Sequence, residues 1–281
     1  MTGTAYASGV ETLKRAGIVS AAAEMRTILS ELTGLSPLEV PLSHRKLADG
    51  ERARLKTILD RRVKREPLQY ILGKAYFFDL ELAVAPAVLI PRPETELLVE
   101  WALRKLPRNG KLLDLGTGSG AIALAVARHR MDARITAADL SPDALIVAER
   151  NAGKCGVSGI RFVRSDLFSA FAAETFDLVA ANLPYVPEAD RAGLDPEVAD
   201  REPGMALFAG EDGFALLERA GRDVASFLAP GGKAIFELDP RQAERMTMLL
   251  TESGFACETI RDLAGRDRFV AGTLTALRSG R

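Results

Sequence analysis

An apolar strand, a glycine-rich turn and a helix follow one another in LLDLGTGSGAIALAVA, which occupies residues 112–127. This order constrains the fold more than any other feature of the chain. Gly116, Gly118 and Gly120 let the backbone turn sharply and let a ligand approach, because no Cβ stands in the way. The next helix presents free N–H groups and the positive end of its dipole. A plain tight turn would not need three alternate glycines, so the stretch predicts a ligand-binding loop.

The chain alternates between strand and helix patterns from residue 94 onward. Strands are expected at 111–115, 135–139, 160–166, 176–182, 233–238, 255–263 and 268–274. Helices are expected at 120–130, 141–154, near 169–173, 212–229 and 240–252. The alternation indicates a parallel sheet covered on both faces. The last two strands are joined by AGRD, too short for a parallel crossover, so they form an antiparallel hairpin. The predicted class is α/β, and the arrangement resembles the Rossmann-like class I S-adenosylmethionine (SAM) methyltransferase fold.

The N-terminal part of the chain has helical periodicity and no strand pattern until Gly73. Helices are expected over 6–18, 20–35, 48–66 and 67–72, with stops at Gly17, Gly34 and Gly73. The alternating YFFDLELAVAP then predicts a strand or hairpin, and Pro86, Pro91 and Pro93 punctuate the stretch APAVLIPRPET. We therefore divide the chain into a helical bundle (1–73), a β-hairpin linker (74–93) and a ligand-binding domain (94–281).

Composition excludes several classes of function. The net charge of −1 and pI of about 6.2 argue against non-specific nucleic-acid binding by the whole chain. The basic stretch RRVKRE at 61–66 is interpreted as a solvated helix face, or alternatively as a contact for a partner protein or RNA. The two cysteines and two histidines have no metal-ligand spacing, so no metal site is predicted. Reduced thiols, no signal-peptide pattern and no apolar run of about 18–20 residues predict a cytoplasmic protein.

The identity of the ligand depends on the carboxylates at the strand ends. Gly116-x-Gly118-x-x-Ala121 also fits a dinucleotide fingerprint, which would bind a pyrophosphate. A carboxylate at Asp114 is unfavourable beside a pyrophosphate and suits the cationic amino-acid part of SAM. Asp139 ends the next strand and is placed to bind both hydroxyls of a ribose, which NAD and SAM share.

A third strand end carries a further carboxylate, Asp166, followed by Leu167. Asp166 is a candidate acceptor for an adenine amine, and the backbone of Leu167 could lie along the ring. The alternative is that Asp166 is a turn residue without a ligand.

The fourth of the parallel strands ends in the stretch NLPY, residues 182–185. There the Asn182 side-chain oxygen and the Leu183 carbonyl can accept both hydrogens of a planar NH2 group and hold it toward a methyl donor. Pro184 restricts the backbone of Leu183 to the extended region, and Tyr185 is a candidate for stacking on the planar group. The alternative, an Asx-type turn with a surface tyrosine, does not explain why these residues share the switch point of the sheet.

These stretches together resemble the release factor glutamine methyltransferases. NLPY is similar to the Asn-Pro-Pro-Tyr motif of amino methyltransferases, which adenine methyltransferases share. More specific are REPLQYILGKAYFFDLELAVAPAVLIPRPETELLVEWAL, DREPGMALFAGEDG and RDLAGRDRFVAGTL. The likeness runs from about residue 8 to 275.

The resemblance implies methylation of the glutamine side-chain amide in the Gly-Gly-Gln motif of class I peptide chain release factors. It implies SAM as donor, S-adenosyl-L-homocysteine as product, and a substrate-recognition role for the bundle. Together with the strand-end carboxylates considered above, the predicted cofactor residues are Asp114, Gly116, Thr117, Gly118, Ser119, Gly120, Asp139, Asp166, Leu167 and Asn182. The implied catalytic residues are Asn182, Leu183, Pro184 and Tyr185.

Two departures from the family pattern are Leu183, where a proline is usual, and FELDP, where Glu-x-Gly is usual.

The long segment 186–211 is expected to act as a lid, and the chain is expected to be a monomer without direct DNA binding. Two alternatives stay open: an adenine methyltransferase on DNA or RNA, and a nicotinamide-dependent oxidoreductase or nucleotide-sensing module.

Overall fold

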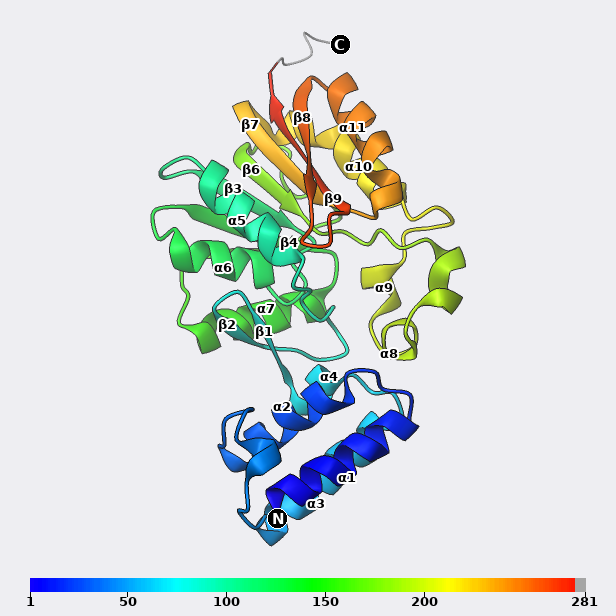
Figure 1. Ribbon diagram of the computed structural model, residues 1–281. Helices are drawn as coiled ribbons and strands as arrows, with labels where there is room; N and C mark the ends of the chain where they lie inside the picture. Colours follow the sequence, from blue (N-terminus) through cyan, green and yellow to red (C-terminus); the bar gives the residue numbers. More distant parts are fainter. Residues whose placement is uncertain (276–281) are drawn as a thin grey trace. The chain divides into compact units, whose positions relative to one another are not determined.

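The computed structural model describes residues 1–275, so the last six residues of the predicted domain 94–281 lie outside it. The chain divides into two compact units (Figure 1). The helical unit comprises Met1–Gly73 together with Asp195–Arg201, and the sheet unit comprises Lys74–Leu194 and the chain from Glu202 onward. The inclusion of 195–201 in the helical unit is not indicated by the sequence. No helix within residues 1–275 combines the length and the apolar character that crossing a membrane requires.

The helical unit packs short amphipathic helices around one apolar core. Its elements are α1 (Thr2–Arg15), α2 (Ala21–Thr33), η1 (Val40–Leu42), α3 (Asp49–Arg62), α4 (Leu68–Leu72) and α8 (Pro196–Ala199). The core includes Leu13 from α1, Met25 and Leu29 from α2, and Leu55 and Ile58 from α3. The expected stops at Gly34 and Gly73 are confirmed, because each caps its helix with φ above +70°.

A buried arginine connects three segments of the helical unit. The Arg62 guanidinium at the end of α3 donates to both carboxylate oxygens of Glu24 on α2, at 2.7 and 3.0 Å. It also donates to Glu197 on α8, at 2.9 Å, and only 3% of Arg62 is exposed. Arg65 pairs with the same Glu197. The expectation of a solvated face at 61–66 is therefore wrong for Arg62, because acidic residues of its own unit compensate its buried charge.

The sheet unit contains a seven-stranded sheet in the order β5-β4-β3-β6-β7-β9-β8. Its strands are β3 (Lys111–Leu115), β4 (Arg134–Asp139), β5 (Arg161–Arg164), β6 (Phe176–Ala181), β7 (Leu228–Glu237), β8 (Phe255–Arg261) and β9 (Asp267–Leu274). All pairs are parallel except those of β9, which runs antiparallel to both β7 and β8. The predicted α/β class with an antiparallel final hairpin is confirmed.

Helices cover both faces of this sheet (Figure 1). One apolar layer includes α5 (Thr95–Lys105), α6 (Ala121–His129) and part of α7 (Pro142–Cys155). The other includes α10 (Ala215–Asp223) and α11 (Ala243–Glu252). Successive residues of β3 belong to different apolar layers. Leu112 lies in the layer that contains α6, and Leu113 lies in the layer that contains α10. The remaining elements are β1 (Lys74–Phe77), β2 (Leu80–Ala83), η2 (Glu188–Gly193), α9 (Gly204–Leu207), η3 (Val224–Phe227) and η4 (Pro240–Gln242).

Three expected elements differ clearly from the structure. Residues 169–173 form no helix, because the Ser165 hydroxyl accepts from the Ala170 N–H and the chain continues as consecutive turns. The strand expected at 233–238 is longer, because β7 already begins at Leu228, and the helix before it ends correspondingly earlier.

We expect Arg62→Leu to lower the free energy of unfolding by about 3 kcal/mol, because it leaves the partly buried Glu24 carboxylate without its cation and removes one of the two cations that pair with Glu197. Arg52→Leu on the same helix is the matched control, since Arg52 is exposed and its loss should change the stability by less than about 0.5 kcal/mol. Urea unfolding measures both. Hydrogen exchange should show faster exchange over 195–201 in Arg62→Leu alone, and equal behaviour of the two variants would contradict this account.

Candidate active site

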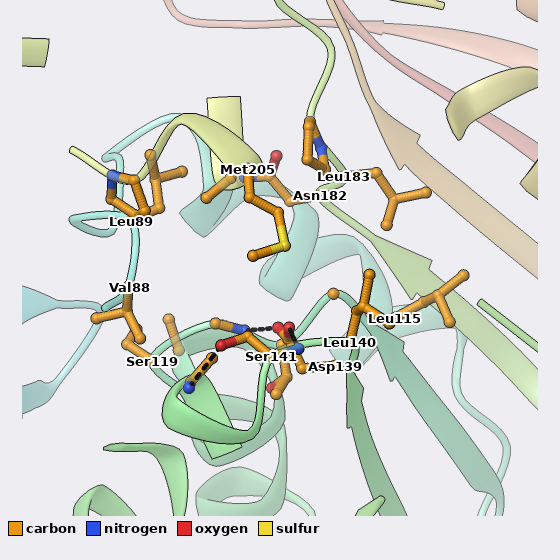
Figure 2. A pocket seen from close by; sticks show the side chains of 18 of the residues that line it. Val88, Leu89, Leu115, Ser119, Asp139, Leu140, Ser141, Asn182, Leu183 and Met205 are labelled. Carbon is orange, nitrogen blue, oxygen red and sulfur yellow. Dashed lines mark hydrogen bonds between the residues drawn. The ribbon is translucent and has the colours of Figure 1, made fainter. Parts of the chain in front are cut away.

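A pocket opens at the carboxyl ends of β3, β4 and β6, where ligands bind in sheets of this kind. It encloses about 1120 Å³ of space, part of it open to solvent. The glycine loop and Asp139 form one side of the pocket, the Asn182 side chain lies across from Asp139 (Figure 2), and Leu183 packs beside Gly116. The linker residues Val88 and Leu89 close a third side, and the Met205 side chain projects inward. These segments come from five separate parts of the chain.

Backbone hydrogen bonds help to hold the glycine loop in place. The N–H groups of Gly116 and Thr117 both donate to the Ala138 carbonyl at 2.9 Å. Gly116 has φ of +77°, and a Cβ there would lie 3.0 Å from the Leu183 side chain. Gly118 has φ of +55°, but a Cβ there would meet nothing within 4 Å. Gly118 lines the pocket, so a Cβ there would take up space that a ligand needs.

Asn151 on α7 fixes the loop to the hairpin. Its Nδ2 donates to the carbonyls of Ala83, at 3.0 Å, and Ser119, at 2.8 Å. Its Oδ1 accepts from the Ala83 N–H at 2.6 Å. The Asn151 side chain is fully buried, so losing it would leave three backbone groups without partners. The sequence offers no signal for this role, because Asn151 occurs inside an ordinary helical pattern.

Asp114 is fully buried and is not one of the residues that line the pocket, which differs from the predicted direct contact with the ligand. Its Oδ2 accepts from the Thr117 hydroxyl at 2.6 Å and from the Ala123 N–H at 3.1 Å. Its Oδ1 has no hydrogen-bond partner within the described residues. Burial raises the pKa of Asp114 to about 7. The buried Asp114 carboxylate therefore stabilises the glycine loop through these hydrogen bonds, on the side of the loop away from the pocket.

Asp139 lines the pocket at the end of β4, where the sequence places it. Its Oδ2 accepts from the Gly118 N–H at 2.8 Å and its Oδ1 from the Ser141 N–H at 2.9 Å. Burial raises the pKa of this carboxyl despite these bonds. Each oxygen keeps a lone pair for a further donor, as a ribose hydroxyl would require. Ser141 caps α7 itself, so Asp139 is not needed for capping.

Asp166 and Leu167 line the pocket beyond β5. Leu167 has a left-handed backbone with φ of +47°, unusual for a residue other than glycine. The Ser165 hydroxyl stabilises this turn by donating to the Leu167 carbonyl at 2.7 Å. Asp166 pairs with Arg219 on α10 at 3.0 Å, so its carboxylate already has one partner.

The NLPY stretch follows β6, and its asparagine belongs to a buried hydrogen-bond chain. Asn182 Nδ2 donates to Thr95 Oγ1 at 3.0 Å, and the Thr95 hydroxyl donates to Glu237 Oε2 at 2.7 Å. The Tyr185 hydroxyl donates to Glu237 Oε1 at 3.2 Å. Asn182, Leu183 and Pro184 line the pocket, whereas Tyr185 does not. The structure thus places Tyr185 outside the pocket lining, where its hydroxyl binds Glu237, and the stacking role stays a prediction.

Sequence reasoning missed Thr95 and Glu237. Thr95 is the first residue of α5 and is 3% exposed, whereas Glu237 ends β7 and is 1% exposed. A glutamate that ends a strand between apolar residues, in FEL, was an available signal. The stretch FELDP, which departs from the usual Glu-x-Gly, has a local explanation at Asp239. The Asp239 side chain accepts a hydrogen bond from the Arg241 N–H and caps η4.

The segment expected to act as a lid is divided between the two units. Pro203, Met205 and Ala206 line the pocket, whereas 195–201 belongs to the helical unit. Glu202 joins two walls of the pocket, since its Oε2 accepts from the Ile90 N–H at 3.1 Å and its Oε1 binds Arg92 at 2.6 Å.

Comparisons with known proteins identify the group to which this architecture belongs. Residues 4–73 match a family model described as the PrmC N-terminal domain, and residues 93–194 match one described as the methyltransferase small domain. A release factor glutamine methyltransferase of Geobacter sulfurreducens is 38% identical, covering 93% of each chain. The relative of the same name in Mycolicibacterium smegmatis is 45% identical, covering 76% of this chain and 77% of its own.

The chain belongs to the release factor glutamine methyltransferase family. The predicted enzyme class, a SAM-dependent protein-glutamine methyltransferase, is confirmed by this membership. Among solved structures, a Pyrococcus furiosus methyltransferase aligns with a TM-score of 0.55 at 18% identity, covering 82% of this chain and 100% of its own. At that identity the likeness supports the fold alone.

The raised pKa of Asp114 predicts a pH-dependent stability. Between about pH 4 and pH 7 the folded enzyme holds this proton while the unfolded chain has released it. The free energy of unfolding should therefore fall as pH rises, by at most about 1.4 kcal/mol per pH unit, and level off above pH 7.

Asp114→Asn should remove most of this slope, and Glu149→Gln, on the exposed side of α7, should not. The measurement is urea unfolding at a series of pH values. A slope of the same size in Asp114→Asn and in the unmodified enzyme would show that Asp114 is ionised when folded.

Proposed function

We propose that this enzyme transfers a methyl group from SAM to the side-chain amide nitrogen of the glutamine in the Gly-Gly-Gln motif of class I release factors. The observation that carries the assignment of roles is the orientation of Asn182. Its amide nitrogen is committed to Thr95, and no hydrogen bond among the described residues takes its Oδ1. Asn182 thus has an acceptor available at the pocket, which suits an NH2 group.

Several parts of the pocket have a shape and chemistry that fit parts of the SAM molecule. Space beside Gly118 remains where any Cβ would intrude, and Asp139 offers carboxylate oxygens at the end of β4. Leu167 provides an apolar edge next to Asp166, as an adenine ring requires. When bound, SAM supplies a methyl group activated by a sulfonium. The loop 116–120, Asp139, Asp166 and Leu167 are the residues assigned to hold it.

The chemical problem for the protein is the weak nucleophilicity of an amide. The nitrogen lone pair is delocalised into the carbonyl group, so the protein must orient the NH2 and favour its pyramidal form. The Asn182 Oδ1 and the Leu183 carbonyl are assigned to accept its two hydrogens. Aimed dipoles of this kind act through positioning and electrostatics and require no strong base, because the positive charge is relieved by loss of a proton.

Leu183 fits this role although a proline is usual at its position. The side chain is 5% exposed and packs on Gly116, so the residue joins the acceptor motif to the glycine loop. Backbone contacts fix the stretch further, since the Tyr185 carbonyl accepts from Gln242 Nε2 at 3.0 Å. The backbone that carries the Leu183 carbonyl is therefore restrained even though residue 183 is not a proline.

We assign residues 1–73 to recognition of the release factor, 74–93 to the linker and 94–281 to methyl transfer. Because the proposed substrates are translation factors, we place the enzyme in the cytoplasm, and we propose that it acts as a monomer without direct DNA binding. The net charge of −1 supports a protein substrate over a nucleic acid.

The first test is a transfer assay with methyl-labelled SAM and a purified class I release factor. Label should appear on the glutamine of the Gly-Gly-Gln motif, and a factor in which this glutamine is alanine should take up none. Adenine-containing DNA is assayed in parallel as the alternative acceptor. Label on DNA, with none on the release factor, would overturn the proposed substrate.

Asn182→Ala should lower kcat by roughly 100-fold, because it removes one of two acceptors aimed at the reacting nitrogen. The dissociation constant for SAM, measured by calorimetry, should change by less than about threefold. Asn109→Ala, the same substitution in an exposed turn, is the control and should leave kcat unchanged. Normal turnover by Asn182→Ala would remove Asn182 from the mechanism.

A further inference from the structure

Glu237 is a buried carboxylate to which no role has been assigned. It ends β7, is 1% exposed and is reached by two hydroxyl groups from separate segments. The Thr95 hydroxyl donates to Oε2 at 2.7 Å and the Tyr185 hydroxyl donates to Oε1 at 3.2 Å. Among residues 1–275 no lysine or arginine forms an ion pair with it. A carboxylate buried without a paired cation is unfavourable for folding, so packing alone does not account for it.

The acceptor character of a carboxylate has a consequence for Thr95. A hydroxyl has one hydrogen, and an ionised carboxylate can only accept. The Thr95 hydrogen is therefore committed to Glu237, and Thr95 Oγ1 can only accept from its other neighbour, Asn182. Of the two ends of the Asn182 amide, only the nitrogen can donate to Thr95. The Asn182 oxygen is then the end left for the pocket.

We propose that Glu237 is a positioning residue that, through the Thr95 hydroxyl, sets which end of the Asn182 amide faces the acceptor pocket. The inference rests on the proposed function, because it assumes that Asn182 Oδ1 binds the substrate NH2. An inverted amide would present its own NH2 to the substrate NH2, and two donors cannot form a hydrogen bond. Glu237 itself touches neither substrate nor donor in this scheme.

Protonation of Glu237 should weaken this control, because a carboxylic acid can donate to Thr95 and release the Thr95 hydrogen toward Asn182. The pKa of Glu237 is raised to about 7, chiefly by burial and to a smaller extent by nearby Glu94, against the opposing effects of the Thr95 and Tyr185 hydrogen bonds and the charge of Arg268. Arg268 is held beside this group, since it donates to the Leu238 carbonyl at 3.0 Å. The kcat of the unmodified enzyme should therefore decline on the acid side of about pH 7.

The test compares Glu237→Gln, Thr95→Val and the double variant by kcat, KM for the release factor and affinity for SAM. Each single substitution keeps the approximate shape of the side chain, but it no longer fixes the direction of the hydrogen bonds between Glu237, Thr95 and Asn182. We expect each to lower kcat roughly 10-fold with little change in SAM affinity. The double variant should be no slower than Thr95→Val, because both changes act through one amide. Thr95→Ser, which keeps the hydroxyl, should recover most of the kcat lost in Thr95→Val.

Two further readouts separate positioning from a purely structural role. The acid-side decline of kcat should be flattened in Glu237→Gln and kept in the control Glu258→Gln, the same substitution on β8 at a residue that binds Trp101. The side-chain amide resonances of Asn182, observed by nitrogen-15 NMR, should shift with pH near neutrality in the unmodified enzyme and not in Glu237→Gln.

The outcomes distinguish this inference from the proposed function. If the unmodified enzyme leaves the release factor unlabelled, the proposed function fails. If it labels the factor and both single variants keep kcat within about twofold, the role of Glu237 is wrong. Additive losses in the double variant would also overturn it, since independent structural defects add. Should Glu237→Gln fail to fold, Thr95→Val and Thr95→Ser decide the matter alone.

Discussion

One hydroxyl group, that of Thr95, joins the segments that hold Asn182 at the pocket, on the side where we propose that the methyl acceptor binds. It accepts from Asn182 at the end of β6 and donates to Glu237 at the end of β7, within the first turn of α5. β6 and β7 are parallel neighbours, so their carboxyl ends lie at the same edge of the sheet. The pairing of these two strands therefore fixes where Asn182 and Glu237 stand, and the Thr95 hydroxyl between them fixes the orientation of the Asn182 side-chain amide.

The side of the pocket that we propose for the cofactor follows the same principle, in which buried polar groups hold the residues that line the pocket. Asp114 braces the glycine loop through Thr117 and the Ala123 N–H, and Asn151 binds the loop to the hairpin through Ser119 and Ala83. Each of these groups is fully buried, and each bonds backbone or side chains of the loop without lining the pocket. The lining is thus preorganised, and reaction by positioning depends on such preorganisation.

The sequence predicted the fold, and it predicted residues that the structure brings together at one pocket, because both depend on local patterns. Strand periodicity, the glycine turn and the polar residues at strand ends are readable along the chain, and parallel topology brings those ends together. The positions of Asp114 and Tyr185 outside the pocket lining did not follow from the sequence, since proximity in sequence to a motif does not say which way a side chain points. Asp114 lies behind the loop and Tyr185 lies beside Glu237.

Other features could not be predicted because they pair residues far apart in the chain. Thr95 and Glu237 are such a pair, and so are Arg62 and Glu197 in the helical unit. A basic run such as 61–66 indicates a solvated face unless its acidic partners are known. A buried ion pair between distant segments leaves no periodic signal in either one.

The most direct measurement is a crystal structure of the enzyme with S-adenosyl-L-homocysteine and a peptide that contains Gly-Gly-Gln. The account predicts the glutamine amide nitrogen at about 3 Å from both Asn182 Oδ1 and the Leu183 carbonyl oxygen. It also predicts that Asn182 Nδ2 remains on Thr95. A glutamine amide bound elsewhere, or an Asn182 whose nitrogen faces the peptide, would contradict it.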